Sequence, residues 1–232
     1  MKPDTTRIAQ VLAIATAIAV FIGLPLLFYA LGDTPRRTYL KEGLSIVTLI
    51  AFSVMLGQFF LARSNKAMLE LFNAPVVQKV HKWIAYGAIL IMALHPFFIV
   101  LPRYFEAGAK PWDALWTMLT TFDSLGILLG LFAWLAMIAI GVTAYFRMRL
   151  MKRFKNKYRG WRAFHAVLTV SFTVAAIWHA IDLGRHTDLA MSLFFVGLAA
   201  AGIAMLARLY LPERPKMSVQ APANAAIAEG AK

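Results

Sequence analysis

Two apolar stretches of this 232-residue sequence begin and end with histidine: HKWIAYGAILIMALH at residues 81–95 and HAVLTVSFTVAAIWH at residues 165–179. In both stretches the two histidines are separated by the same interval. At about 100° per residue, that interval of 14 residues falls about 40° short of four full turns of an α-helix. We therefore expect each histidine pair to lie along one face of a helix, about 21 Å apart along its axis.

The segments around these stretches are also apolar. A transmembrane helix needs roughly 20 mostly apolar residues, and the sequence contains six such segments, at residues 8–31, 44–61, 83–101, 125–146, 164–181 and 189–211. The first is too long for a typical signal peptide, so we interpret it as a retained span. With 60% apolar and 15% charged residues, the composition argues against a water-soluble enzyme. We predict an all-α, polytopic bundle of six transmembrane helices over residues 1–211, followed by a disordered cytoplasmic tail at residues 212–232.

The net charge of +13 follows from the topology expected for six spans. With the N-terminus in the cytoplasm, 18 of the 24 Lys and Arg residues, but only 4 of the 11 acidic residues, fall on the cytoplasmic side. This is the bias of an inner (plasma) membrane protein with both termini in the cytoplasm. The charge is thus explained by membrane lipid as a partner, and it requires no nucleic acid. A basic segment at residues 147–162 is expected to rest on lipid headgroups, and it could also dock an acidic electron donor.

Histidine is the best metal ligand available, because the sequence contains no cysteine. The third and fifth spans run in the same direction, and an equal offset of 84 residues relates His81 to His165 and His95 to His179. Each pair is therefore expected at one depth, on two facing helices. Two facing imidazoles suit the axial ligation of heme iron, whereas a structural zinc site would need four ligands at one depth. We predict two heme b groups, one near each membrane face, with helices three and five carrying the ligands. The alternative is that these histidines are hydrogen-bonded packing residues.

Other residues are weaker candidates for the heme sites. Phe172 lies seven residues from both His165 and His179, either between the hemes or as a plain core aromatic. Arg162, Lys82 and Arg103 are expected near heme edges, where they would pair with propionates or anchor the chain at the membrane interface. Two further features favour structural roles. Gly126 and Gly130 form a GxxxG motif typical of close helix packing, and His186 is interpreted as a solvated loop histidine, the alternative being a weak ferric-ion or acceptor site.

The segments WRAFHAVLTVSFTVAAIWH (161–179), with the basic segment before it, and HKWIAYGAILIMALHP (81–96) resemble the ferric reductase-like transmembrane domain family. That family includes the membrane portion of NADPH oxidases and the heme subunit of the periplasmic methionine sulfoxide reductase system. The resemblance covers about residues 40–210. It implies electron transfer from a cytoplasmic flavin through stacked hemes to an outer acceptor. It also implies that His81 and His165 bind the inner heme, and that His95 and His179 bind the outer one. In the methionine sulfoxide reductase subunit the position of His81 is not a histidine, which favours the two-heme reductases here.

These observations predict a transmembrane diheme b-type cytochrome, the membrane electron-transfer component of an oxidoreductase. It would relay electrons from a cytoplasmic flavoprotein or a quinol to an outer acceptor such as ferric iron. The sequence has no Gly-rich dinucleotide fingerprint in a strand–turn–helix context, so FAD or FMN is expected on a separate partner. No residue of the chain is assigned as catalytic. Two alternatives are a heme subunit that delivers electrons to a periplasmic reductase, and a non-heme membrane transporter or assembly factor.

Overall fold

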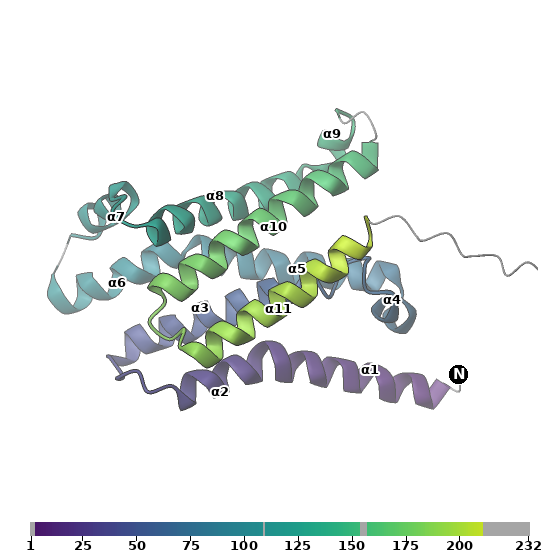
Figure 1. The fold of residues 1–232 in the computed structure, drawn as a ribbon, viewed down its shortest axis with the longest axis horizontal. Helices are drawn as coiled ribbons and strands as arrows, with labels where there is room; N and C mark the ends of the chain where they lie inside the picture. The colour runs from purple at the N-terminus through teal and green to yellow at the C-terminus, as the bar shows by residue number, and fades with distance from the viewer. Residues whose placement is uncertain (1–2, 109, 154–156, 211–232) are drawn as a thin grey trace, which may run out of the picture.

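A computed structural model describes residues 3–108, 110–153 and 157–210, and within these ranges the regular structure is entirely helical (Figure 1). The elements are α1 (Pro3–Ile18), η1 (Ala19–Gly23), α2 (Leu24–Leu31), α3 (Tyr39–Gly57), α4 (Lys66–Phe72), α5 (Ala74–Ala93), α6 (His95–Ala107), α7 (Pro111–Thr120), α8 (Leu125–Tyr145), α9 (Arg147–Met151), α10 (Lys157–Leu183) and α11 (Leu189–Arg208). The tail predicted to be disordered, residues 212–232, lies outside the described residues.

The described residues contain five helices long and apolar enough to cross a membrane, and six if the bent pair α5 and α6 counts as one. The first span runs unbroken through α1, η1 and α2, over Thr5–Leu31. The prediction of an all-helical, multi-pass bundle is therefore confirmed. One boundary differs clearly, because α3 begins at Tyr39 and the end of the predicted second span, residues 58–61, forms turns.

The third span is broken between its two histidines. Residue Leu94 is a turn, and α5 and α6 meet there at a bend of 41°. Pro96 is next to the break, in the first turn of α6. Proline has no N–H to donate, and its ring clashes with the carbonyl four residues earlier. The expectation that His81 and His95 share one helix is therefore wrong, whereas His165 and His179 do share α10, as predicted.

The two ends of the bundle differ in the elements they carry. The start of α1 and the end of α11 lie at the same end as α4 and α9 (Figure 1). At the opposite end lie α7 and the loops that connect α2 to α3 and α10 to α11 (Figure 1). We call these the α9 end and the α7 end. The arrangement agrees with six crossings, which return the chain to the side on which it began.

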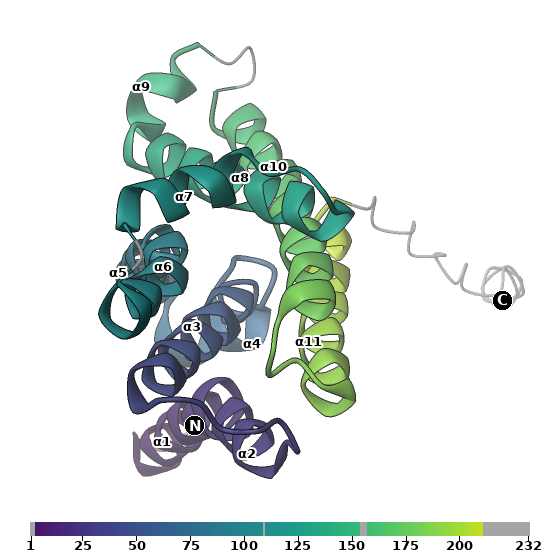
Figure 2. The same ribbon diagram turned by 90° about the vertical axis from the view of Figure 1, so that its left-hand side faces the viewer.

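The core lies where the central helices meet, and α8 and α10 make the most extensive helix contact among the described residues (Figure 2). Small residues of α8, such as Ala133 and Ala136, are buried with Ala176 and Phe172 of α10. The outer surface is apolar too, and the side chain of Val167, for example, is 68% exposed. A bundle that is apolar both inside and outside is suited to lipid rather than to water.

Helix α7 was not foreseen in the sequence. Its two tryptophans, Trp112 and Trp116, are 73% and 70% exposed. Tryptophan is enriched where a membrane meets water, because its ring is apolar and its N–H is polar. Helix α7 therefore has the side chains expected of a short segment lying along a membrane surface.

Candidate metal centre

The structure brings the rings of His95 and His179 close together near the α7 end. Their ring centroids are 6.4 Å apart and the ring planes are nearly perpendicular, at 85°. His95 is the first residue of α6, directly after the break, whereas His179 lies within α10. Both line a cavity of about 630 Å³ whose walls include Phe52, Trp134 and Phe172. The mostly apolar lining of this cavity is typical of cofactor sites.

The distance between these rings matches two imidazoles that bind one metal ion from opposite sides. A metal–imidazole bond is about 2 Å long, and the ring centroid lies about 1.1 Å behind the ligating nitrogen, so the centroids should be about 6.2 Å apart. The measured separation of 6.4 Å is close to this value. Nδ1 of His95 is buried and has no hydrogen-bond partner among the described residues. The donor set and the cavity therefore fit the axial ligation of heme.

The ring of His179 is fixed by a hydrogen bond. Its Nδ1 lies 2.9 Å from the backbone carbonyl oxygen of Gly126, in the first turn of α8. A carbonyl oxygen only accepts hydrogen bonds, so Nδ1 carries the proton and donates it. Nε2 of His179 is thereby left as the nitrogen with a free lone pair. This is the arrangement in which metal-binding histidines are commonly held.

The break before His95 is also supported by a hydrogen bond. Nε1 of Trp134, on α8, donates to the backbone oxygen of Ala93 over 3.2 Å. A break in a helix leaves carbonyl groups without their usual partner, and such groups are costly inside a membrane. Trp134 therefore stabilises the bend that positions His95.

The second pair lies toward the α9 end, where His81 of α5 and His165 of α10 are close enough to interact electrostatically. The ring of Trp161 stacks on His165 at 5.2 Å, and Tyr158 stacks on Trp161 at 6.3 Å. Nδ1 of both histidines is buried without a hydrogen-bond partner among the described residues. The facing of two rings expected from the equal offset is therefore found for His95 and His179, while the facing of His81 and His165 and ligation at both levels stay predictions.

The other candidate residues are distributed between the two levels. Phe172, at 5% exposed, belongs to the core and also lines the cavity. The guanidinium of Arg162 lies over the rings of Tyr158 and Tyr210, at 5.8 and 5.6 Å. Arg103 is exposed at the wall of the cavity. Exposed Lys82 is at the other level, beside His81 in sequence, with its amino group 5.5 Å from the ring of Trp83.

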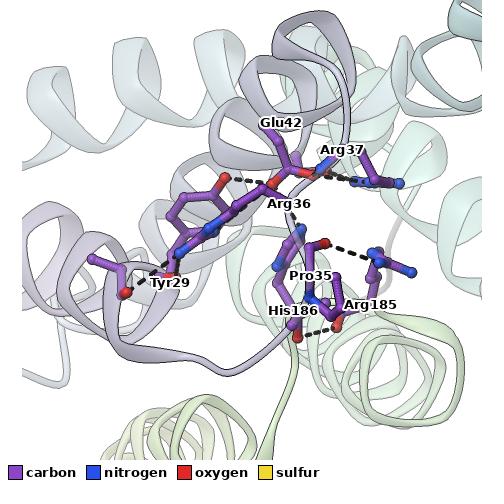
Figure 3. Close-up of polar contacts among 10 residues, drawn as sticks. Tyr29, Pro35, Arg36, Arg37, Glu42, Arg185 and His186 are labelled. Atoms are coloured by element: carbon purple, nitrogen blue, oxygen red, sulfur yellow. Dashed lines mark hydrogen bonds and ion pairs between the residues drawn. The ribbon is translucent and has the colours of Figure 1, made fainter.

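His186 is not the solvated loop residue that the sequence suggested. It is only 8% exposed, and it reaches the wall of the same cavity. Its Nε2 lies 3.1 Å from Oε2 of Glu42, and its ring is 4.8 Å from that of Tyr29 (Figure 3). Burial lowers the pKa of His186. The charge of Glu42 opposes this shift, and nearby arginines reinforce it.

Glu42 is the centre of this cluster, and no motif in the sequence pointed to its role. The hydroxyl of Tyr29 donates to its carboxylate. Arg37 donates to the same carboxylate from its backbone N–H, over 3.1 Å, and from Nε, over 2.9 Å. Arg185 donates to the carbonyl of Pro35 over 2.9 Å (Figure 3). These contacts join the α2–α3 loop, α3 and the α10–α11 loop around a buried carboxylate.

Across the residues that the structure describes, no group of three or more His, Cys, Asp or Glu side chains could hold a metal ion. This finding separates the histidine pairs from zinc sites, which take three or four protein ligands. A pair of imidazoles needs a ligand that fills the remaining coordination positions, as a porphyrin does.

Comparison with known proteins adds a family match. Residues 47–176, more than half of the chain, match the family described as ferric reductase like transmembrane component. The match includes His81, His95 and His165 and ends shortly before His179. An uncharacterized protein of Archaeoglobus fulgidus is 36% identical over 165 residues, which cover 71% of this chain and 87% of that protein. No solved structure matches the chain.

Proposed function

Because the chain belongs to the ferric reductase-like transmembrane component family, whose members typically bind heme, we propose that it is a transmembrane diheme b-type cytochrome. It relays electrons from a donor on the cytoplasmic face of the inner (plasma) membrane to an acceptor on the outer face. The α9 end lies in the cytoplasm and the α7 end faces outward. This orientation places the basic residues of α9 on the side that the positive-inside rule favours.

The observation that carries the proposal is the facing of His95 and His179 across the cavity, with ring centroids 6.4 Å apart. His81 and His165 supply the second pair of axial ligands, nearer the α9 end. When bound, heme supplies the one-electron redox chemistry. The protein supplies four imidazoles and an apolar shell to which Phe172 contributes between the two levels.

The residues around each pair have defined parts in this function. Trp161 fixes the plane of His165 by stacking on it, and Trp134 holds the bend that presents His95. Arg162 and Arg103 provide positive charge near the two levels, suited to carboxylate groups at a cofactor edge. His186 is an unsuitable ferric-ion site, because its buried Nε2 already faces Glu42.

Electrons reach the inner pair from a cytoplasmic flavoprotein that carries FAD or FMN, or from a quinol. The segment 147–162 has eight positive charges and no acidic residue, and its described part includes α9. Such a segment attracts an acidic protein as well as anionic lipid. On the outer face the acceptor is a species such as ferric iron.

A second candidate function is delivery of electrons to a periplasmic reductase, for example a methionine sulfoxide reductase. The observation that favours it is the Glu42 cluster. Its hydrogen bonds and ion pairs connect the α2–α3 loop and the α10–α11 loop at the α7 end, beside the outer pair. The presence of both His81 and His165 favours the diheme relay instead. A third possibility, of another class, is a transporter or assembly factor that holds no heme.

Heme content tests the proposal. We expect purified protein to contain two heme b groups per chain, by pyridine hemochrome assay, with the reduced-minus-oxidised spectrum of bis-histidine ligation. His81→Ala or His165→Ala should abolish the low-spin signal of one heme only, because a lost axial ligand leaves iron open or heme unbound. A single heme in the wild-type protein, insensitive to His81→Ala, would support the second candidate. Complete absence of heme after expression with heme precursor would support the third.

A further inference from the structure

The two histidines of the outer pair are held very differently. Nδ1 of His179 donates to the carbonyl oxygen of Gly126, whereas Nδ1 of His95 has no hydrogen-bond partner among the described residues. His179 lies within the 27-residue helix α10, but His95 is the first residue after a 41° bend. Orientation is thus fixed at one ligand and looser at the other.

Two glycines of α8 allow α10 to approach closely, and one of them, Gly130, makes room for the ring of His179. A Cβ atom at position 130 would overlap Nδ1 of His179 and lie 2.6 Å from its Cε1. A Cβ atom at position 126 would overlap the carboxylate of Asp182, one turn further along α10. Any larger residue at 130 would therefore push against the imidazole itself. Gly130 lets the ring approach α8, and the carbonyl oxygen of Gly126 accepts the hydrogen bond from Nδ1 of His179.

Resting on the proposed function, we propose that Gly126 and Gly130 are positioning residues that make His179 the anchoring ligand of the outer heme, with His95 the weaker, replaceable one. A hydrogen bond from Nδ1 to a carbonyl fixes the tautomer, orients Nε2 toward the cavity and makes the imidazole a stronger ligand. The GxxxG motif at residues 126–130 thus has a part in cofactor binding beyond helix packing.

Because His95 and His179 are held differently, we expect His95→Ala and His179→Ala to have different effects on heme content. His95→Ala should keep the outer heme, held by His179, with one open position that binds carbon monoxide. His179→Ala should lose the outer heme, because the ring of the remaining ligand, His95, has no hydrogen bond at Nδ1 among the described residues to orient it. Loss of a hydrogen bond that orients a metal-binding histidine commonly weakens metal binding roughly 10–100-fold. The measurements are heme per chain and the carbon monoxide difference spectrum of each variant.

Gly130→Ala tests the glycines directly, and Gly141→Ala is its matched control on the same helix. A Cβ atom at position 141 would meet only the side chain of Ile89, at 3.5 Å, which is ordinary contact. We expect Gly130→Ala to lose the outer heme or to convert its low-spin spectrum to a high-spin one. The inner heme should remain and report that the bundle is folded. Gly141→Ala should retain both hemes with wild-type spectra.

The inference is overturned if Gly130→Ala keeps two low-spin hemes with wild-type midpoint potentials. It is equally overturned if His95→Ala and His179→Ala lose the outer heme to the same extent, a comparison that stands even if Gly130→Ala fails to fold. Wild-type protein without heme would instead defeat the proposed function. The two failures are therefore distinguishable.

Discussion

At the scale of single residues, the charge of Glu42 has a direct bearing on stability, because its carboxylate is buried. A carboxylate inside a membrane protein is costly unless it is paired and hydrogen-bonded. Here Arg37 and Tyr29 meet that need, and Arg36 lies over the ring of Tyr29 at 4.1 Å. His186 closes the cluster from the loop that follows α10. The cluster therefore holds the cavity wall together at the α7 end.

Glu42→Gln should destabilise the protein markedly. The amide keeps the size of the side chain and accepts from Tyr29, but it leaves Arg37 and Arg36 without their counter-charge. Because Arg37 and Arg36 are partly exposed, the cost should lie below the roughly 3–5 kcal/mol typical of breaking a fully buried ion pair. The measurement is thermal unfolding in detergent, with Glu70→Gln, on α4, as the control. Equal melting temperatures for Glu42→Gln and wild-type protein would contradict this prediction.

His186 should make stability depend on pH. Burial lowers its pKa, so folding favours the neutral imidazole. The stabilisation is therefore fully present above the pKa of an unfolded histidine, about 6.5, and it declines as the pH falls below that value. We expect the melting temperature to fall between pH 7.5 and pH 5.5 by more in wild-type protein than in His186→Gln. Parallel pH profiles for the two proteins would rule out this role.

At the scale of elements, the break between α5 and α6 sets the position of His95 in the outer pair. If the helix continued unbroken through residue 94, His95 would lie in a straight continuation of α5. The bend instead directs α6 along the cavity, whose wall includes Pro96 and Pro102. Trp134 then binds the carbonyl of Ala93 that the bend exposes.

Pro96→Ala should perturb the outer heme and leave the inner one unchanged. Alanine restores an N–H and removes the ring that clashes with the preceding turn, so α5 and α6 can straighten. His95 would then move relative to His179. The expected result is a shift in the midpoint potential or spin state of one heme, measured by redox titration. Pro111→Ala, at the start of α7, is the control. If both variants titrate like the wild-type protein, the bend does not depend on Pro96.

At the scale of the whole molecule, the two ends of the bundle differ in charge, and each end has its own histidine pair. The chain carries +13 overall, and eight of its positive residues fall in the segment 147–162. We therefore expect the α9 end to attract acidic partners, and the inner histidine pair lies on that side. The outer pair lies beside the Glu42 cluster at the other end. A relay across the membrane needs two such distinct ends.

Electron input by a flavoprotein should depend on salt. Reduction by the native donor should slow as ionic strength rises, because the Debye length falls from about 10 Å at 0.1 M to about 3 Å at 1 M. Replacing Lys152, Arg153, Lys155 and Lys157 with Gln should slow it further at low salt. The measurement is stopped-flow reduction at equal heme content, with Lys110→Gln, at the α7 end, as the control. A rate insensitive to both changes would indicate a quinol donor instead.

The sequence alone determined the all-helical, multi-pass architecture and predicted which histidines pair. Hydropathy acts locally, since each segment of about 20 apolar residues must satisfy its own backbone in lipid. The equal offset of 84 residues predicted that His81 pairs with His165 and His95 with His179, and the structure brings the rings of His95 and His179 together. Pro96 stands beside His95 in the sequence, but the break of the helix at Leu94 was not predicted from it.

Only the tertiary structure decided how the outer pair is held and what surrounds it. The hydrogen bond from His179 to Gly126 joins residues 53 positions apart, and the contact of His186 with Glu42 joins residues even further apart in sequence. No local pattern encodes such contacts, because they depend on which helix faces another and how closely. A histidine in a polar loop is expected in water. His186 is buried because three segments, distant in sequence, meet around the carboxylate of Glu42.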